Sequence, residues 1–176
     1  MYDKQIIEAF YKRRTPELIE SVGKEEMKRL LSYEYSEIDR GFVGFIENYF
    51  DLQNLPKDFT IVDIDCYQAV QAHYFREHSL YIGIDDGLPV EYRLRQDNAK
   101  YFAEKAEDFI IGYLPGMIER GELYIDKTFA ICSAVPSKEA VDVCKKTFKY
   151  FRISYPGYAP LNKYPDGYNP LNLTHA

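Results

Sequence analysis

Polar side chains that could bind a ligand follow the first four strands that the sequence predicts. Carboxylates accept hydrogen bonds from hydroxyl and ammonium groups, and amides both donate and accept. In open parallel sheets, ligands bind beyond the carboxyl ends of the strands. The sequence therefore predicts a ligand site at one edge of a sheet, formed by the residues just after these strands: Asp65 to Ala69, Asp85 to Gly87, Asp97 with Asn98, and Ser133 to Pro136.

The strands that would position these residues alternate with helices along the chain. Short runs rich in β-branched and aromatic residues predict strands at 59–64, 80–84, 92–95, 129–135 and 150–154. Apolar spacing and capping residues predict helices over 67–75, 98–111 and 137–148. Such alternation is typical of βαβ units with right-handed crossovers. We expect an α/β fold: a Rossmann-like three-layer sandwich whose mostly parallel sheet has about five strands.

The chain divides into three segments. Residues 1–54 show helical spacing, as in Ile6, Ile7 and Phe10, and predict an N-terminal helical segment. Residues 55–154 form the α/β core. Residues 155–176 are a Tyr/Pro-rich tail, which we expect to lack regular structure and to pack over the sheet through its tyrosines. The alternative for this tail is a partner-binding arm.

Composition narrows the class of protein. Of 176 residues, 46% are hydrophobic and 28% are charged, which fits a folded domain. The net charge of −6 disfavours nucleic acid as a partner. No apolar run is long enough to span a membrane, so we expect no membrane association and a cytoplasmic location. The three cysteines form no C-x-x-C pair and predict buried free thiols, and no metal-ligand motif is present.

Three successive sequence pieces resemble the motifs of class I S-adenosylmethionine-dependent methyltransferases. The first runs from Val62 to Ala69 (VDIDCYQA), the second from Tyr81 to Asp85 (YIGID), and the third is Asp97-Asn98. The segment from Phe129 to Pro136 resembles the fourth strand of that family. The resemblance covers roughly residues 59 to 154 and implies the same Rossmann-like fold.

The resemblance also implies roles for the residues at the strand ends. Asp85 would bind the ribose hydroxyls of S-adenosylmethionine, and Asp86 is an alternative for this role. Asp97, with Asn98 beside it, would bind the adenine amino group. Asp63 would lie under the methionine end, near Asp65 and Tyr67 of the first loop. The residues Ser133, Val135 and Pro136 would border the acceptor site, and the acceptor is a small molecule or a protein.

The first loop departs from the family. Asp65, Tyr67 and Ala69 occupy positions where the family has glycines, which tolerate positive φ and leave room for the ligand. The sequence thus predicts a methyltransferase-like protein with weakened or lost cofactor binding. The alternatives are a catalytically inactive relative that acts as a binding or regulatory module, and a Rossmann-like enzyme that uses another nucleotide.

The predicted sheet is shorter than that of the family, which has seven strands with a final antiparallel hairpin. About five strands precede the proline-rich tail. Either the sheet is truncated or the tail supplies an irregular edge. An edge strand must be covered or paired, so the sequence also predicts a homodimer formed through that edge.

Overall fold

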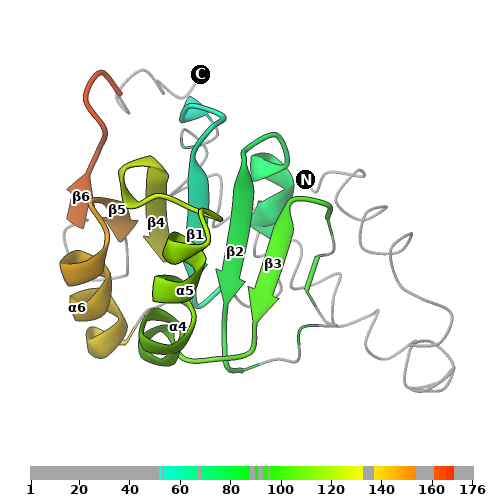
Figure 1. The fold of residues 1–176 in the computed structure, drawn as a ribbon, viewed down its shortest axis with the longest axis vertical. Coiled ribbons are helices and arrows are strands. Elements are labelled where there is room, and N and C mark those ends of the chain that lie inside the picture. The colour runs from blue at the N-terminus through cyan, green and yellow to red at the C-terminus, as the bar shows by residue number, and fades with distance from the viewer. Residues whose placement is uncertain are drawn as a thin grey trace, which may run out of the picture.

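A six-stranded sheet forms the centre of the computed structural model (Figure 1). The model describes residues 52, 54–66, 69–87, 90, 93, 94, 96–132, 137–153 and 161–168. The strand order is β3-β2-β1-β4-β5-β6, with β1 to β5 parallel and β6 antiparallel to β5. The strands are β1 (Thr60–Ile64), β2 (Leu80–Ile84), β3 (Ala99–Phe102), β4 (Thr128–Cys132), β5 (Tyr150–Ile153) and β6 (Leu161–Lys163).

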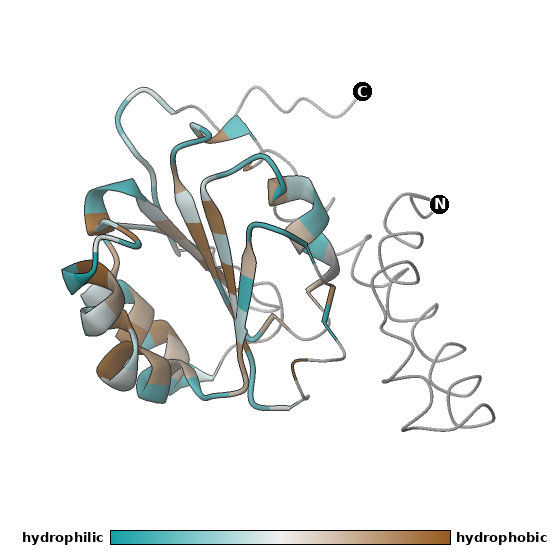
Figure 2. Cartoon of the chain, turned by 45° about the vertical axis from the view of Figure 1, so that its right-hand side comes forward, coloured by the Kyte–Doolittle hydropathy of each residue, from teal (hydrophilic) through white to brown (hydrophobic). Residues whose placement is uncertain are grey.

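Helices cover both faces of the sheet, so the predicted three-layer α/β architecture is confirmed. The helices are η2 (Val70–Phe75), α4 (Ala106–Gly112), α5 (Leu114–Glu119), η4 (Ile125–Lys127) and α6 (Lys138–Thr147). The 3-10 helix η2 packs on one face, where Phe75 contacts the core around Tyr81. Helices α4, α5 and α6 pack on the other face, and Figure 2 shows the sheet between these two layers.

Strand β1 lies in the middle of the sheet, and all five of its residues are buried. Its side chains alternate between the layers: Ile61 belongs to the core under η2, and Val62 and Ile64 belong to the core under α4 and α6. A β-branched run buried on both faces is what a central parallel strand requires. The carboxyl ends of β1, β2 and β4 therefore meet at one edge of the sheet.

The third strand differs from the prediction. Residues 92–95 were expected to form it, but Arg93 and Leu94 lie outside any strand, and β3 spans Ala99–Phe102. The helix expected over 98–111 begins only at Ala106. Strand β3 pairs with β2 alone, and none of its four residues is fully buried. Its pairing with β2 outweighs a sequence pattern that favours helix, because tertiary context overrides local propensity.

The C-terminal tail adds a sixth strand where no regular structure was expected. Strand β6 lies between Pro160 and Pro165, pairs with β5 and forms the edge of the sheet. An edge is the position that proline-rich sequence tolerates. Beyond β6, Tyr164 and Tyr168 pack against the core, and the Tyr164 ring stacks on Phe129 with a centroid distance of 6.0 Å. The prediction that tail tyrosines cover the sheet is thus confirmed for residues 161–168.

The remaining predictions concern the cysteines, the first helix of the core, the N-terminal segment and membrane-spanning helices. The cysteines are free and buried, as predicted. The predicted helix over 67–75 is present as η2, a 3-10 helix that begins at Val70. The N-terminal helical segment lies outside the described residues, apart from residues 52 and 54. Among the helices that are described, none has the length and apolarity to cross a membrane.

Candidate functional site

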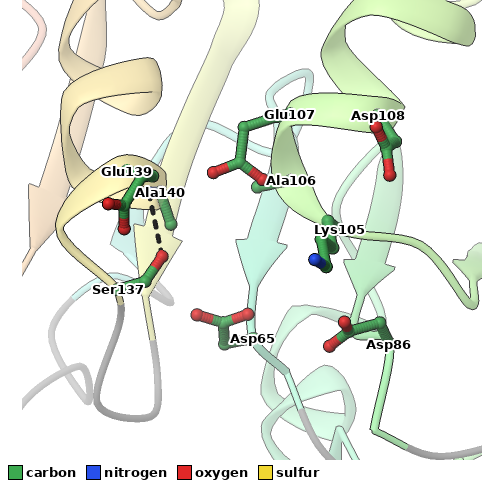
Figure 3. A pocket seen from close by; sticks show the side chains of 9 residues that line it. All are labelled: Asp65, Asp86, Lys105, Ala106, Glu107, Asp108, Ser137, Glu139 and Ala140. Carbon is green, nitrogen blue, oxygen red and sulfur yellow. Dashed lines mark hydrogen bonds between the residues drawn. The ribbon is translucent and has the colours of Figure 1, made fainter.

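A pocket of about 760 Å³ opens at the carboxyl edge of the sheet, where the sequence predicted a ligand site (Figure 3). Figure 3 shows Asp65, at the end of β1, between the start of α6 and the start of α4. The nine lining residues come from the segments after β1, β2, β3 and β4: Asp65, Asp86, Lys105, Ala106, Glu107, Asp108, Ser137, Glu139 and Ala140. The strand order changes direction between β1 and β4, and ligands of open α/β sheets bind at that point.

The pocket lining is strongly acidic, with five carboxyl side chains and one lysine. Glu107 and Asp108 lie in the first turn of α4, and Glu139 lies in the first turn of α6. Carboxylates stabilise helix N-termini, so these three have a structural role as well. Together the five side chains give the pocket a negative potential that favours cationic and hydroxyl-bearing ligands and disfavours phosphates.

Asp65 and Ala69 adopt the backbone conformation that favours glycine. Both have a φ of 57°, and they are the non-glycine residues with positive φ in the described part of the chain. These are two of the three loop positions that the predicted resemblance to methyltransferases aligns with glycines. The loop after β1 therefore keeps a left-handed backbone at both of these positions without glycine. Tyr67, the third position, lies outside the described residues.

Asp65 is an unusually basic carboxylate. Its pKa is raised to about 6, first because the side chain is partly buried and then because Asp85, Asp86 and Glu107 repel its negative charge. Perturbed carboxylates of this kind are concentrated at functional sites, although structural networks also produce them.

The two acids after β2 differ in what they contact. The Asp85 Oδ1 atom accepts a hydrogen bond of 2.7 Å from the Gly87 amide and lies 3.7 Å from the Arg93 Nη2 atom. Asp85 is buried, whereas Asp86 is exposed and lines the pocket. Of these two acids, Asp86 is the one that lines the pocket.

Asp63 lies beneath the loop and does not line the pocket. Its carboxylate is fully buried on the η2 side of the sheet and accepts hydrogen bonds from the Tyr81 hydroxyl and the Gln71 amide. Burial and the Asp63 charge raise the pKa of Tyr81 well above its usual value, so this phenol stays a donor. The cluster connects β1, β2 and η2 below the predicted site.

The structure does not bring Asp97 and Asn98 to the pocket. They precede β3, and the Asn98 carbonyl accepts from the Tyr81 amide at the start of β2, so they lie at the amino edge of the sheet. The Asn98 side-chain amide donates to the carbonyls of Phe75 and His78 at 2.9 Å each. The predicted placement of Asp97 at the carboxyl end of the third strand is wrong, because β3 begins after it, at Ala99.

Several lining residues escaped the sequence analysis. Lys105 and Glu107 were placed inside a helix that was expected to begin at residue 98, eight residues before the observed start of α4 at Ala106. Ser137 was identified as a helix cap, and its hydroxyl does accept from the Ala140 amide at 3.1 Å, but its place beside the pocket was missed. The predicted acceptor residues Ser133, Val135 and Pro136 lie outside the described residues.

No family model and no curated protein matches the sequence. The fold is similar to the crystal structure of the plantazolicin methyltransferase BpumL in complex with a monoazolic desmethylPZN analog and SAH, at 17% identity and a TM-score of 0.46. The match covers 85% of this chain, which spans 59% of that one. This likeness is one of fold and assigns no residue or ligand to this chain.

Proposed function

We propose that this protein binds S-adenosylmethionine in the acidic pocket and acts as a methyltransferase-like protein on a small-molecule or protein acceptor. The observation that carries the proposal is the negative charge of a ligand-sized pocket, which lies where the strand order changes direction between β1 and β4. Its volume of about 760 Å³ lies in the range of pockets that enclose small ligands. When bound, S-adenosylmethionine supplies a methyl group on a positively charged sulfur.

The donor set fits this ligand better than it fits a phosphorylated nucleotide. S-adenosylmethionine carries a sulfonium, an ammonium and one carboxylate, and the pocket offers five carboxylates and one lysine. Asp86 can accept both ribose hydroxyls, and Lys105 can pair with the ligand carboxylate. A phosphate at ~5 Å from one lining carboxylate would be repelled by about 3 kcal/mol at an effective dielectric of ~20. This charge pattern argues against a dinucleotide or ATP as ligand.

The chain's own contribution to methyl transfer would be to position the reactants and exclude water. Effects of this kind can lower a barrier substantially without a dedicated acid or base. Asp65, placed between α4 and α6, would lie closest to the sheet end and would interact with the positive groups of the ligand.

The alternative is a catalytically inactive relative that acts as a binding or regulatory module. One observation favours it: a carboxylate at Asp65, in left-handed backbone, where the family has glycine. Repulsion between Asp65 and the ligand carboxylate would weaken binding, and the positive groups of the ligand would offset part of it.

Thermal unfolding of the full chain with added ligand tests the proposal. S-adenosylmethionine or S-adenosylhomocysteine at ~100 times its dissociation constant should stabilise the chain by about 2.7 kcal/mol, whereas ATP and NAD should not. Asp86→Asn should remove the shift, and Asp142→Asn, an exposed α6 position outside the pocket, should keep it. No shift at millimolar S-adenosylhomocysteine would contradict cofactor binding and favour the inactive module.

A further inference from the structure

Arg93 is the largest of the fully buried side chains among the described residues, yet Arg93 itself belongs to no helix or strand. A buried guanidinium is costly unless it is paired and hydrogen-bonded, so its surroundings show what it does. Its neighbour Leu94 is also fully buried and accepts a hydrogen bond from the Tyr101 hydroxyl of β3. Arg93 and Leu94 are therefore both buried against the core, and Leu94 is also hydrogen-bonded to β3.

The Arg93 side chain contacts both loops that carry pocket acids. Its Nη2 atom donates to the Asp85 carbonyl at 2.7 Å and lies 3.7 Å from the Asp85 carboxylate. It also lies near the buried thiol of Cys66, which directly follows Asp65, and its positive charge opposes the rise in the pKa of that thiol. The loop after β1 is further attached to β2, because the Cys66 amide donates to the Ile84 carbonyl at 3.1 Å.

These contacts hold the backbone directly next to Asp86. Asp85 receives Arg93 on its carbonyl and the Gly87 amide on its carboxylate, so the residues on either side of Asp86 are both held. Asp86 itself is exposed and points into the pocket region in Figure 3. Arg93 thus contacts the residue directly before Asp86 and does not itself line the pocket.

We propose that Arg93 is a positioning residue: it holds the loops of Asp65 and Asp86 in one arrangement, and so sets the recognition of ligand hydroxyl groups by Asp86. This inference rests on the proposed function for the identity of the ligand. It assigns no contact between Arg93 and the ligand.

The first experiment measures ligand discrimination. Dissociation constants are determined by calorimetry for S-adenosylhomocysteine and for its 2′,3′-dideoxy analogue, which lacks the ribose hydroxyls. The native chain should prefer the hydroxylated ligand by roughly a hundredfold, the effect of two hydrogen bonds to a carboxylate. Arg93→Lys, which keeps the charge and loses the planar fork, should reduce this preference to about tenfold or less. Its affinity for the dideoxy analogue should stay within about twofold of native.

Two further variants make the result specific. Asp86→Asn should lose the preference, and the double variant with Arg93→Lys should lose no more, because both changes act on one contact. Arg152→Lys is the matched control: Arg152 is also buried, but it donates to the Tyr164 hydroxyl beside β5, away from the pocket. It should keep the native preference. Equal weakening of both ligands in Arg93→Lys, or an unchanged preference, would overturn the inference.

A second measurement needs no ligand and separates the inference from the proposed function. Amide hydrogen exchange of the free chain should show Arg93→Lys speeding exchange at Cys66 and Gly87 together, while β4 and α6 stay protected. Asp85→Asn, which is nearly isosteric, should do the same if Arg93→Lys does not fold. Faster exchange in one loop only, or in neither, would overturn the inference. If the native chain binds no S-adenosylhomocysteine, the proposed function fails, and the exchange result still decides the role of Arg93.

Discussion

At the scale of single residues, Asp65 is the side chain whose environment most opposes its charge. It is partly buried, lies among other carboxylates, and has a left-handed backbone. Asparagine tolerates the same backbone and carries no charge. A pKa raised from 3.8 to about 6 means that the folded state binds a proton more tightly than the unfolded state. Asp65 therefore favours folding below pH 4, and this contribution is lost as the pH rises to about 6.

Asp65→Asn should accordingly stabilise the chain at neutral pH. We expect a gain of about 1 kcal/mol in the free energy of unfolding at pH 7.5, after discounting for the solvent exposure of the carboxyl group. The gain should vanish at pH 4, where the native carboxyl is protonated. Denaturant unfolding at both pH values measures the difference, and Asp142→Asn is the control. Equal stability of native and variant at pH 7.5 would contradict the electrostatic account.

At the scale of elements, Gly83 shows how closely β2 packs against its neighbours. A Cβ atom at Gly83 would lie 2.7 Å from the Tyr101 ring of β3 and 2.9 Å from the Cys66 sulfur. Both neighbours are held in place: the Tyr101 hydroxyl donates to Leu94, and Cys66 is buried beside Arg93. Glycine here provides the space in which the loop after β1 packs onto the sheet.

Gly83→Ala should therefore destabilise the fold by about 1–3 kcal/mol, the usual effect of overpacking a dense interior. Gly112→Ala is the matched control, because nothing lies within 4 Å of the position of its Cβ. Since Gly112 lies in α4, that change should be neutral or gain up to about 1 kcal/mol. Thermal unfolding of the two variants checks this, and equal effects would show that the close contacts at Gly83 do not control stability.

The same elements show what the sequence could and could not predict. Strands β1, β2 and β4 and the Ser137-capped helix α6 were predicted because runs of β-branched residues and a capping hydroxyl act locally. Strand β3 was misplaced because it is short, partly exposed and defined by its pairing with β2. Asp65 and Asp86 were predicted for the site because they follow correctly placed strands. Asp97 was placed wrongly with the strand, and Arg93 had no local signal, because arginine side chains are normally exposed.

At the scale of the whole molecule, strand β6 occupies the sheet edge through which a homodimer was predicted. The edge of β5 through which a dimer was predicted is paired with β6 of the same chain. A dimer would now have to form through the outer side of β6 or through another surface. One such surface is the α4–α5 side of the molecule, which carries exposed apolar side chains. Ile111 of α4 is 79% exposed there.

Light scattering at micromolar concentration tests the homodimer. A mass twice that of the 20.7 kDa chain would support it, and a mass near that of the chain would contradict it. Ile111→Lys then tells the two surfaces apart: it should leave a dimer formed through β6 intact and dissociate one formed through α4 and α5.

The strand order β3-β2-β1-β4-β5-β6 splits the sheet into two halves that are each continuous in sequence. Strands β1 and β4 adjoin where the two halves meet. The chain passes from the first half to the second between β3 and β4, through the turn at Gly121. Lys105 and Asp65 belong to the first half and Glu139 to the second, so both halves contribute walls to the pocket. If the chain is cleaved at this turn, we expect the two fragments to stay associated through the β1–β4 pairing. A ligand bound in the pocket should strengthen their association, because it would contact residues of both fragments.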